Sequence, residues 1–114
     1  MAERRRVMSK TLDVRVFQVF FDQIEKGVKT TEYREMSDYW MHRLVDTSKY
    51  GDLGEAELRD AISKDPDPPY RPFSVIRFHC GGRTLERRIT GIRTYPCHDW
   101  FAIKLGKSGA ADGK

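Results

Sequence analysis

The sequence lacks the features that identify secreted and membrane-spanning proteins. Its 114 residues include only two cysteines, Cys80 and Cys97, too few for a framework of several disulfides. No stretch approaches the roughly 20 apolar residues that a membrane helix needs. The basic run Arg4-Arg5-Arg6 is not followed by the apolar region of a secretory signal. We therefore expect a cytoplasmic protein that has no membrane partner.

Sequence motifs for metals, phosphate loops and catalytic triads are also absent. His79-Cys80 and Cys97-His98 are adjacent pairs, and neighbours on a strand point to opposite faces. Neither pair belongs to a CxxC or HxxxH spacing of the kind that binds zinc. Cys97-His98-Asp99 is not a triad, because triad members meet in space and not through adjacency in sequence. We therefore expect no metal and no other cofactor.

Charge is divided unevenly between two parts of the chain. The net charge is +4, but residues 13–64 hold eight basic and eleven acidic residues, while residues 71–93 hold six arginines and one glutamate. Guanidinium groups suit phosphates and base edges, so a polyanionic partner such as RNA is plausible through Arg83, Arg87 and Arg88. The alternative is an ordinary solvated strand face, because net charge alone does not specify function.

Hydrophobic spacing predicts two strand–helix pairs in the first half of the chain. Residues 12–16 alternate apolar and charged side chains, as a half-buried strand does. Residues 17–24 follow a helical period, and Gly27 is suited to end that helix. Residues 29–35 predict a second strand, and Ser37 is a suitable N-cap for a second helix. The buried stripe of this second helix would be Trp40, Met41 and Leu44.

The second half predicts hairpins. Residues 46–69 are a polar loop and a short helix that prolines end, which we interpret as an inserted excursion. Two strands, 73–78 and 84–92, flank the turn Gly81-Gly82, and a last strand covers 100–105. So many hairpins favour an α+β fold, a small mixed β-barrel of five or six strands with two or three short covering helices.

We expect one domain over residues 11–106, between flexible tails at 1–10 (basic) and 107–114. The predicted core consists of Phe17 or Phe20, Phe21, Ile24, Trp40, Leu44, Val75, Ile89 and Ile103.

Side chains suited to ligand binding are densest between residues 27 and 44. Glu32 and Arg34 are two apart, so on a strand they share a face with Thr30. A carboxylate can accept from an exocyclic amine of a base, and a guanidinium can donate to a phosphate. The alternative is a mutual ion pair that only orients the two groups. Tyr33 would lie on the opposite face, in the wall of the barrel.

The second predicted helix adds an aromatic and a basic side chain. Tyr39 and Arg43 are four residues apart and share a helix face, where they could stack on or clamp a base. The alternative for both is a solvated helix face. Trp40 has the same spacing to Leu44, which favours a core position for its ring.

Gly27, Lys29, Glu32 and Arg34 match the GxKxxExR signature, so the chain resembles the ASCH domain of the PUA-like superfamily. The helix before the signature and the final strand 100–106 are similar to those of the family. The resemblance covers roughly residues 12–106, apart from 46–69. It implies a PUA-like β-barrel with a cleft between barrel and helices, lined by Lys29, Glu32 and Arg34.

The resemblance implies an RNA- or nucleotide-binding module. Some small members of the family resemble hydrolases, either nucleoside amidohydrolases or ribonucleases. In the amidohydrolases a threonine nucleophile lies three residues after the lysine, where this chain has Glu32. An enzyme reading would therefore rest on Lys29, Glu32 and Thr30. A third alternative is a protein-interaction module that uses residues 46–69.

Overall fold

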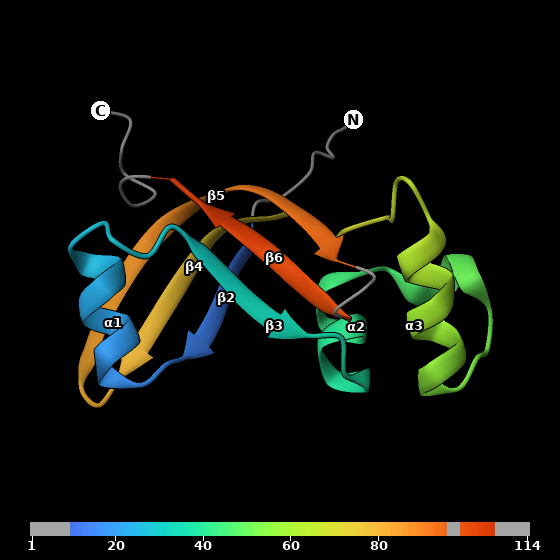
Figure 1. The fold of residues 1–114 in the computed structure, drawn as a ribbon, viewed down its shortest axis with the longest axis horizontal. Helices are drawn as coiled ribbons and strands as arrows, with labels where there is room; N and C mark the ends of the chain where they lie inside the picture. The colour runs from blue at the N-terminus through green and yellow to red at the C-terminus, as the bar shows by residue number, and fades with distance from the viewer. Residues whose placement is uncertain (1–9, 96–98, 107–114) are drawn as a thin grey trace, which may run out of the picture. The chain divides into compact units, whose positions relative to one another are not determined.

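The protein is an α+β fold of five strands and three α-helices within the part of the chain described, residues 10–95 and 99–106 of a computed structural model (Figure 1). The elements are β2 (Lys10–Arg15), α1 (Gln18–Glu25), β3 (Thr31–Glu35), α2 (Asp38–Leu44), a 3-10 helix (Thr47–Tyr50), α3 (Glu55–Lys64), β4 (Phe73–Cys80), β5 (Arg83–Tyr95) and β6 (Trp100–Leu105). This order confirms the α+β class. Residue 10 begins β2, whereas the rest of both predicted tails lies outside the described residues.

The five strands form one mixed sheet in the order β2-β4-β5-β6-β3. Strand β2 pairs with β4 in parallel, and β4 pairs with β5 in antiparallel orientation. The β4–β5 hairpin closes at Cys80 and Arg83 around Gly81-Gly82, and the positive φ of Gly81, 61°, is one that glycine adopts without strain. Within the described strands, β2 and β3 are the two ends of the order, so the hydrogen bonding does not close this sheet into a barrel.

The chain divides into two compact units. Unit 1 comprises the described residues of Met1–Glu32, Pro72–Gly91 and Lys104–Lys114. Unit 2 comprises Tyr33–Arg71 and the described residues of Ile92–Ile103. Strands β3, β5 and β6 contribute residues to both units. No helix of the described residues has the length and apolarity needed to cross a membrane.

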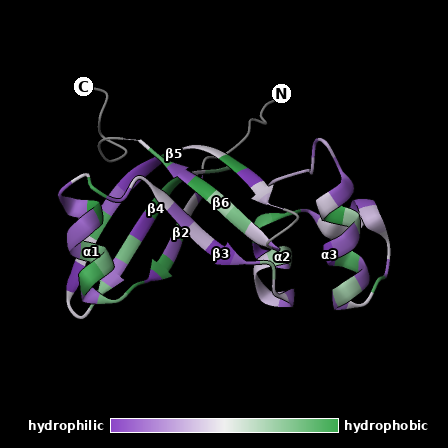
Figure 2. Ribbon diagram, in the orientation of Figure 1, coloured by the Kyte–Doolittle hydropathy of each residue, from purple (hydrophilic) through white to green (hydrophobic). Residues whose placement is uncertain are grey.

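The core of unit 1 lies between α1 and one face of the strands. Its fully or nearly fully buried side chains are Leu12, Val14, Phe21, Ile24, Ile76 and Phe78. The prediction of Val75 was wrong by one position, because Ile76 and Phe78 take the inward side of β4 and alternation turns Val75 to the other face. Ile89, also predicted to be buried, is only half-buried. Figure 2 shows apolar and polar residues alternating along β2 and β4.

Helix α1 buries a narrower stripe than its sequence predicts. Phe21 and Ile24 are buried as expected, but Phe17 is 78% exposed and Phe20 is 41% exposed. Phe17 is the N-cap residue and has extended backbone with φ −71° and ψ 155°, so the helical period does not extend to it. An eight-residue helix turns only one side toward the sheet, and Phe20 lies beside that side.

The core of unit 2 is built from β6, α2 and α3. Its buried apolar side chains are Met36, Met41, Leu44, Val45, Leu58, Ile62, Phe101, Ala102 and Ile103. The predicted cap of α2 is confirmed, since the side chain of Ser37 accepts from the backbone N–H of Trp40 at 3.3 Å. Leu44 and Ile103 are buried as predicted, whereas Trp40 is only half-buried. Two of the nine buried residues belong to α3, so the excursion 46–69 supplies part of this core.

Candidate functional site

Glu32 is the only buried charged residue in the described part of the chain, with 5% of its surface exposed. Its Oε1 atom lies 3.3 Å from the Nζ atom of Lys29. A carboxylate removed from water requires a compensating charge or hydrogen bonds, because its desolvation in a protein interior costs roughly several kcal/mol. Lys29 supplies part of that compensation within unit 1.

The turn after α1 positions Lys29. Gly27 has a φ of 79°, the left-handed conformation that glycine adopts at a helix C-terminus. The N–H groups of Gly27 and Val28 donate to the carbonyls of Ile24 and Gln23 at 3.0 and 2.9 Å, a Schellman motif. Lys29 then donates from Nζ to the carbonyl of Thr31 at 2.6 Å. The signature glycine therefore sets the direction from which the ammonium reaches Glu32.

Buried and exposed side chains alternate along strand β3, and Tyr33 lies on the exposed side instead of the buried one. Glu32 is buried and Arg34 half-buried, whereas Tyr33 is 46% exposed and packs on Tyr95 with ring centroids 6.0 Å apart. The prediction that Tyr33 forms part of the wall was therefore wrong. Glu32 and Arg34 occupy alternate positions of one strand as predicted; Glu32 belongs to unit 1 and Arg34 to unit 2.

Unit 2 gathers two guanidinium groups and two aromatic rings, which we call the α2 cluster: Arg34, Tyr39, Trp40 and Arg43. The guanidinium carbon of Arg34 lies 5.1 Å from the centre of the Trp40 ring, and that of Arg43 lies 5.9 Å from both rings. Tyr39 and Trp40 meet edge to face, with centroids 5.2 Å apart and planes at 89°.

The α2 cluster is held in place and faces solvent. Arg43 donates from an Nη atom to the hydroxyl of Tyr39 at 2.6 Å, which confirms that the two side chains lie together on the helix. Tyr39 is 59% exposed. Planar rings and guanidinium groups at these distances form a surface onto which a further planar group can stack.

Sequence reasoning gave Tyr39 and Arg43 this role but placed Trp40 in the core. A signal for Trp40 was available, because Trp40 and Met41 are neighbours and lie about 100° apart on a helix. The narrow buried side of α2 is taken by Met41 and Leu44.

The arginine hairpin, defined as Arg83, Arg87 and Arg88 on β5, is largely engaged inside unit 1. Arg83 contacts Asp22 at 3.5 Å and Glu25 at 3.1 Å, and its guanidinium carbon lies 4.4 Å from the centre of the Phe21 ring. Arg87 donates to the carbonyls of Ile24 and Glu25 at 3.2 and 3.4 Å. Its positive charge stabilises the C-terminus of α1, where the helix carbonyls carry partial negative charge. Arg88 is exposed. That this hairpin contacts phosphates stays a prediction.

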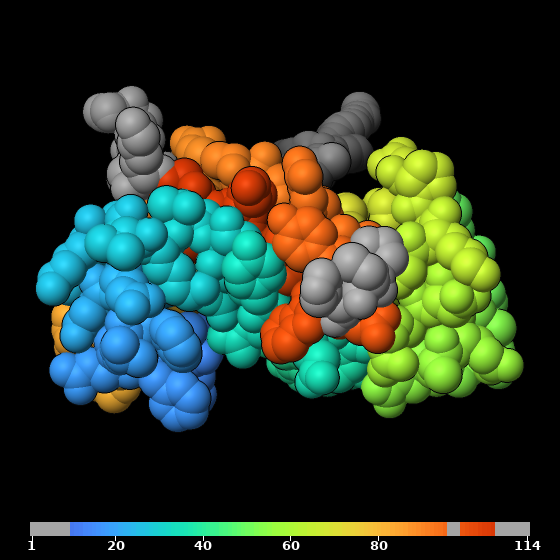
Figure 3. Space-filling model, viewed as in Figure 1, coloured from blue at the N-terminus to red at the C-terminus, as the bar shows by residue number. Residues whose placement is uncertain are grey.

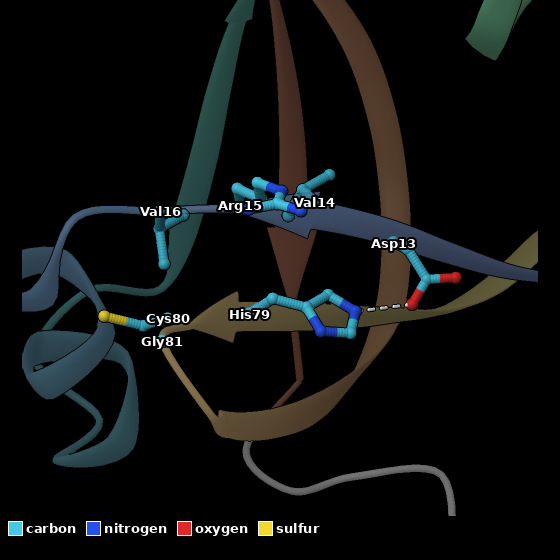
Figure 4. Close-up of a pocket in the computed structure, with 7 residues that line it drawn as sticks. All are labelled: Asp13, Val14, Arg15, Val16, His79, Cys80 and Gly81. Atoms are coloured by element: carbon cyan, nitrogen blue, oxygen red, sulfur yellow. Dashed lines mark hydrogen bonds and ion pairs between the residues drawn. The ribbon is translucent and has the colours of Figure 1, made fainter.

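A hollow of about 420 Å³ lies in unit 1 between β2 and the end of β4. The imidazole Nε2 of His79 lies 2.7 Å from a carboxylate oxygen of Asp13 (Figure 4). Arg77 approaches the same oxygen at 3.5 Å. The thiol of Cys80 points away from the imidazole. Sequence reasoning missed the Asp13–His79 pair, because the two residues meet only through the parallel pairing of β2 and β4.

A polar cluster in unit 2 is formed by Lys49, Tyr50, Asp65 and Tyr70, and three of these residues have shifted pKa values. A hydrogen bond from Lys49 at 2.7 Å, then one from the Tyr50 hydroxyl, lowers the pKa of Asp65 from 3.8 to about 2. Burial, then the hydrogen bond to Asp65, raises the pKa of Tyr50 above its usual value. Burial, then the nearby carboxylate of Asp65, raises the pKa of Tyr70 to about 12. The contacts of Lys49 and Tyr50 with Asp65 therefore join the 3-10 helix to the end of α3.

No group of three or more His, Cys, Asp or Glu side chains in residues 10–95 and 99–106 is arranged to hold a metal ion. Cys97 and His98 of the rejected metal pairs lie outside the described residues. No family model, curated protein or solved structure matches this chain.

Proposed function

We propose that the protein binds single-stranded RNA or a nucleotide. The observation that carries this proposal is the α2 cluster, in which the half-buried Trp40 ring and the exposed Tyr39 ring meet edge to face beside the guanidinium groups of Arg34 and Arg43. Bases stack on aromatic faces regardless of sequence, and guanidinium groups bind the phosphates between them.

The signature residues divide their roles in this proposal. Arg34 belongs to the α2 cluster and contacts the ligand. Lys29, which is half-buried, and the buried Glu32 form a pair that holds the start of β3 within unit 1. We further propose that the domain is an open-sheet relative of the PUA-like domains of the ASCH type; the support is the four signature positions together with the α+β element order.

Fluorescence anisotropy of a labelled single-stranded RNA tests the proposal. Trp40→Ala is expected to weaken binding by about 5- to 150-fold, since stacking on one aromatic ring is worth about 1–3 kcal/mol per base. Trp40→Phe keeps a stacking face and should retain most of the affinity. Tyr33→Ala is the control: it removes an exposed ring of unit 2 that packs on Tyr95, and it should bind like the parent. If Trp40→Ala binds RNA as tightly as the parent does, the α2 cluster is not a nucleic-acid site.

A hydrolase of the same fold is the second candidate, and the buried Glu32 beside Lys29 is the observation that favours it. A buried carboxylate and an ammonium in contact are a possible acid–base pair for hydrolysis of an amide or a phosphodiester. Glu32 occupies the position of the threonine nucleophile, so the chemistry would have to rely on Lys29, Glu32 and Thr30. Mass analysis of acylated cytidine and short RNAs after incubation separates the two candidates: products that Glu32→Gln abolishes would establish the enzyme, and intact substrates would leave the binding module.

A further inference from the structure

Unit 1 exposes a group of large apolar side chains around α1, which we call the α1 patch: Phe17, Val19, Phe20 and Val28. Their exposed fractions are 78%, 56%, 41% and 72%. They account for all the large apolar side chains of unit 1 that are exposed within the described residues. Figure 3 shows α1 and the turn after it at the molecular surface. An apolar group of this kind left in water marks an interaction site more often than a requirement of folding.

The start of α1 does not require an aromatic side chain. Phe17 is the N-cap, where Ser, Thr, Asp or Asn would satisfy a helix N–H, and it makes no side-chain capping bond. The hydrophobic staple positions before and after the cap belong to Val16 and the buried Phe21. The ring of Phe17 instead lies 6.4 Å from that of Phe20, at the surface. Phe17 could therefore be polar with no loss to the helix.

The end of α1 does not require Val28 either. Val28 donates its N–H to the carbonyl of Gln23, as the second residue after a helix does in a Schellman motif. The side chain at this position usually packs on an apolar residue at the position of Gln23, which here is polar. Val28 is 72% exposed, so the cap does not account for its apolar side chain.

The charges around the α1 patch cancel. The charged side chains of α1 and its neighbours are two acidic and two basic: Asp22, Glu25, Lys26 and Arg83. Lys29, whose ammonium lies 5.8 Å from the centre of the Phe20 ring, is paired with Glu32. A strongly charged partner therefore gains little here. In a two-fold contact the same surface meets itself, and an apolar centre bordered by charges of both signs is complementary to a copy of itself.

The size of the patch matches the apolar centre of a small two-fold interface. From their exposed fractions, the two phenylalanines and two valines expose roughly 350 Å², on the areas that such side chains bury when fully covered. Two copies together would bury about 700 Å² of apolar surface. Specific interfaces at the lower end of the size range bury about 1,200 Å², of which somewhat more than half, about 700 Å², is apolar.

We propose that the α1 patch is the centre of a two-fold contact between two copies of this chain. The contact lies entirely in unit 1 and does not rest on the proposed function. Interfaces of standard size range from micromolar to picomolar affinity, so a contact at the small end should dissociate at about micromolar concentration or above.

Sedimentation equilibrium of the whole chain tests the inference over protein concentrations from about 1 µM to about 1 mM, where a small interface dissociates. The apparent mass should rise from the monomer value of 13.3 kDa toward twice that value as concentration increases. In Phe17→Ser/Phe20→Ser the dissociation constant should increase about tenfold or more, because aromatic anchors carry much of the affinity of such contacts. Phe17→Ser alone, which puts a favourable residue at the N-cap, should weaken association in the same direction while α1 stays folded.

Two variants of unit 2 are the controls. Leu53→Ser removes an exposed apolar side chain away from the α1 patch and should associate like the parent. Trp40→Ala should also associate like the parent, although it is expected to weaken RNA binding. Self-association and RNA binding can therefore fail independently of each other.

NMR amide signals compared at high and low protein concentration locate the contact. The signals of residues 17–29 should shift on dilution, whereas those of α2 and α3 should not. A monomeric mass over the whole concentration range would reject the inference, and so would association that Phe17→Ser/Phe20→Ser leaves unchanged. If the parent stays monomeric and this variant loses binding to phosphatidylcholine vesicles or to RNA, the inference is also rejected, and the patch is a lipid or nucleic-acid surface.

Discussion

The arginine hairpin of unit 1 and the arginines of the α2 cluster in unit 2 have different surroundings. In unit 1, Arg83 contacts two carboxylates of α1, and Arg87 donates to two carbonyls at the end of the same helix. In unit 2, Arg34 and Arg43 lie over the ring of Trp40. A basic stretch in a sequence therefore does not by itself locate a binding surface.

The two kinds of surroundings differ in whether a ligand can reach the groups involved. Oxygen atoms of the protein compensate a guanidinium and fix it in one place, so that it fastens one element to another. A guanidinium over a partly exposed ring such as Trp40 builds a stack that a base can extend, whereas the ring beside Arg83 is the buried Phe21. We infer that unit 1 is the scaffold around Glu32 and that the α2 cluster is the main contact surface.

The largest expected effect breaks the scaffold of unit 1. Lys29→Met removes the ammonium that contacts the buried Glu32 and should lower the free energy of unfolding by up to about 3 kcal/mol, the lower end for breaking a buried pair, since Lys29 itself is half-buried. Urea unfolding measures this loss. Adding Glu32→Gln should restore part of it, because a neutral amide costs less to bury. The matched control Lys26→Met, at an exposed position, should change stability by less than about 0.5 kcal/mol. A loss as small for Lys29→Met would contradict the account.

The next effect compares two neighbours on β5. Arg87→Ala removes the donor to the C-terminus of α1 and should cost about 1.5 kcal/mol of stability. Arg88→Ala, at an exposed position, should cost less than about 0.5 kcal/mol. Chemical denaturation of both variants under one set of conditions measures the difference. Equal losses would show that Arg87 does not hold α1.

A smaller effect compares arginines of the two units in binding. Arg43→Ala should lower the slope of log affinity against log salt by about 0.7, the value for one phosphate contact on a single strand. Arg83→Ala should leave that slope unchanged, because its guanidinium already contacts Asp22 and Glu25. The triple variant Arg83→Ala/Arg87→Ala/Arg88→Ala tests the whole hairpin in the same titration. A larger change from Arg83→Ala than from Arg43→Ala would reverse the assignment of the two units.

The smallest effect is the pH dependence of unit 2. The lowered pKa of Asp65 favours its charged form in the folded state, so its stabilisation is complete above about pH 4 and is lost as pH falls through about 2. The raised pKa of Tyr70 favours the neutral phenol, so stability declines as pH rises from about 10 to about 12.

Tryptophan fluorescence follows this unfolding, since Trp40 and Trp100 both belong to unit 2. Asp65→Asn should flatten the acid limb, whereas Asp60→Asn, which removes an exposed carboxylate of α3, should leave it steep. An unchanged acid limb in Asp65→Asn would show that the Lys49 and Tyr50 contacts do not stabilise the fold.

The sequence predicted the order of the elements well, because period and turn chemistry are local. Alternation in residues 12–16, the glycine after α1 and the Ser37 cap each act within a few residues. The sequence-based prediction failed where a shift of one residue along a strand, or one side of a helix, decides which side chain is buried. Val75 and Ile76 are both apolar, and only the pairing of β4 with its neighbours selects Ile76 for the core.

The sequence predicted which residues belong to the candidate site better than it predicted how they are arranged. Lys29 with Glu32 and Tyr39 with Arg43 are three and four residues apart, so their contacts follow from local geometry. The exposure of Trp40 depends on how little of the seven-residue helix α2 faces the core. The Asp13–His79 pair joins residues 66 positions apart, which no spacing rule in a single sequence reveals.

Fluorescence of Trp40 during a titration with single-stranded RNA tests the central claim most directly. A Trp100→Phe background leaves Trp40 as the only tryptophan in the chain. The account predicts saturable quenching, because a base stacked on the ring alters its emission, and predicts that Arg43→Ala and Tyr39→Ala each shift the titration to higher RNA concentration. Unchanged Trp40 fluorescence at RNA concentrations where anisotropy shows complete binding would contradict it, since the nucleic acid would then bind elsewhere on the protein.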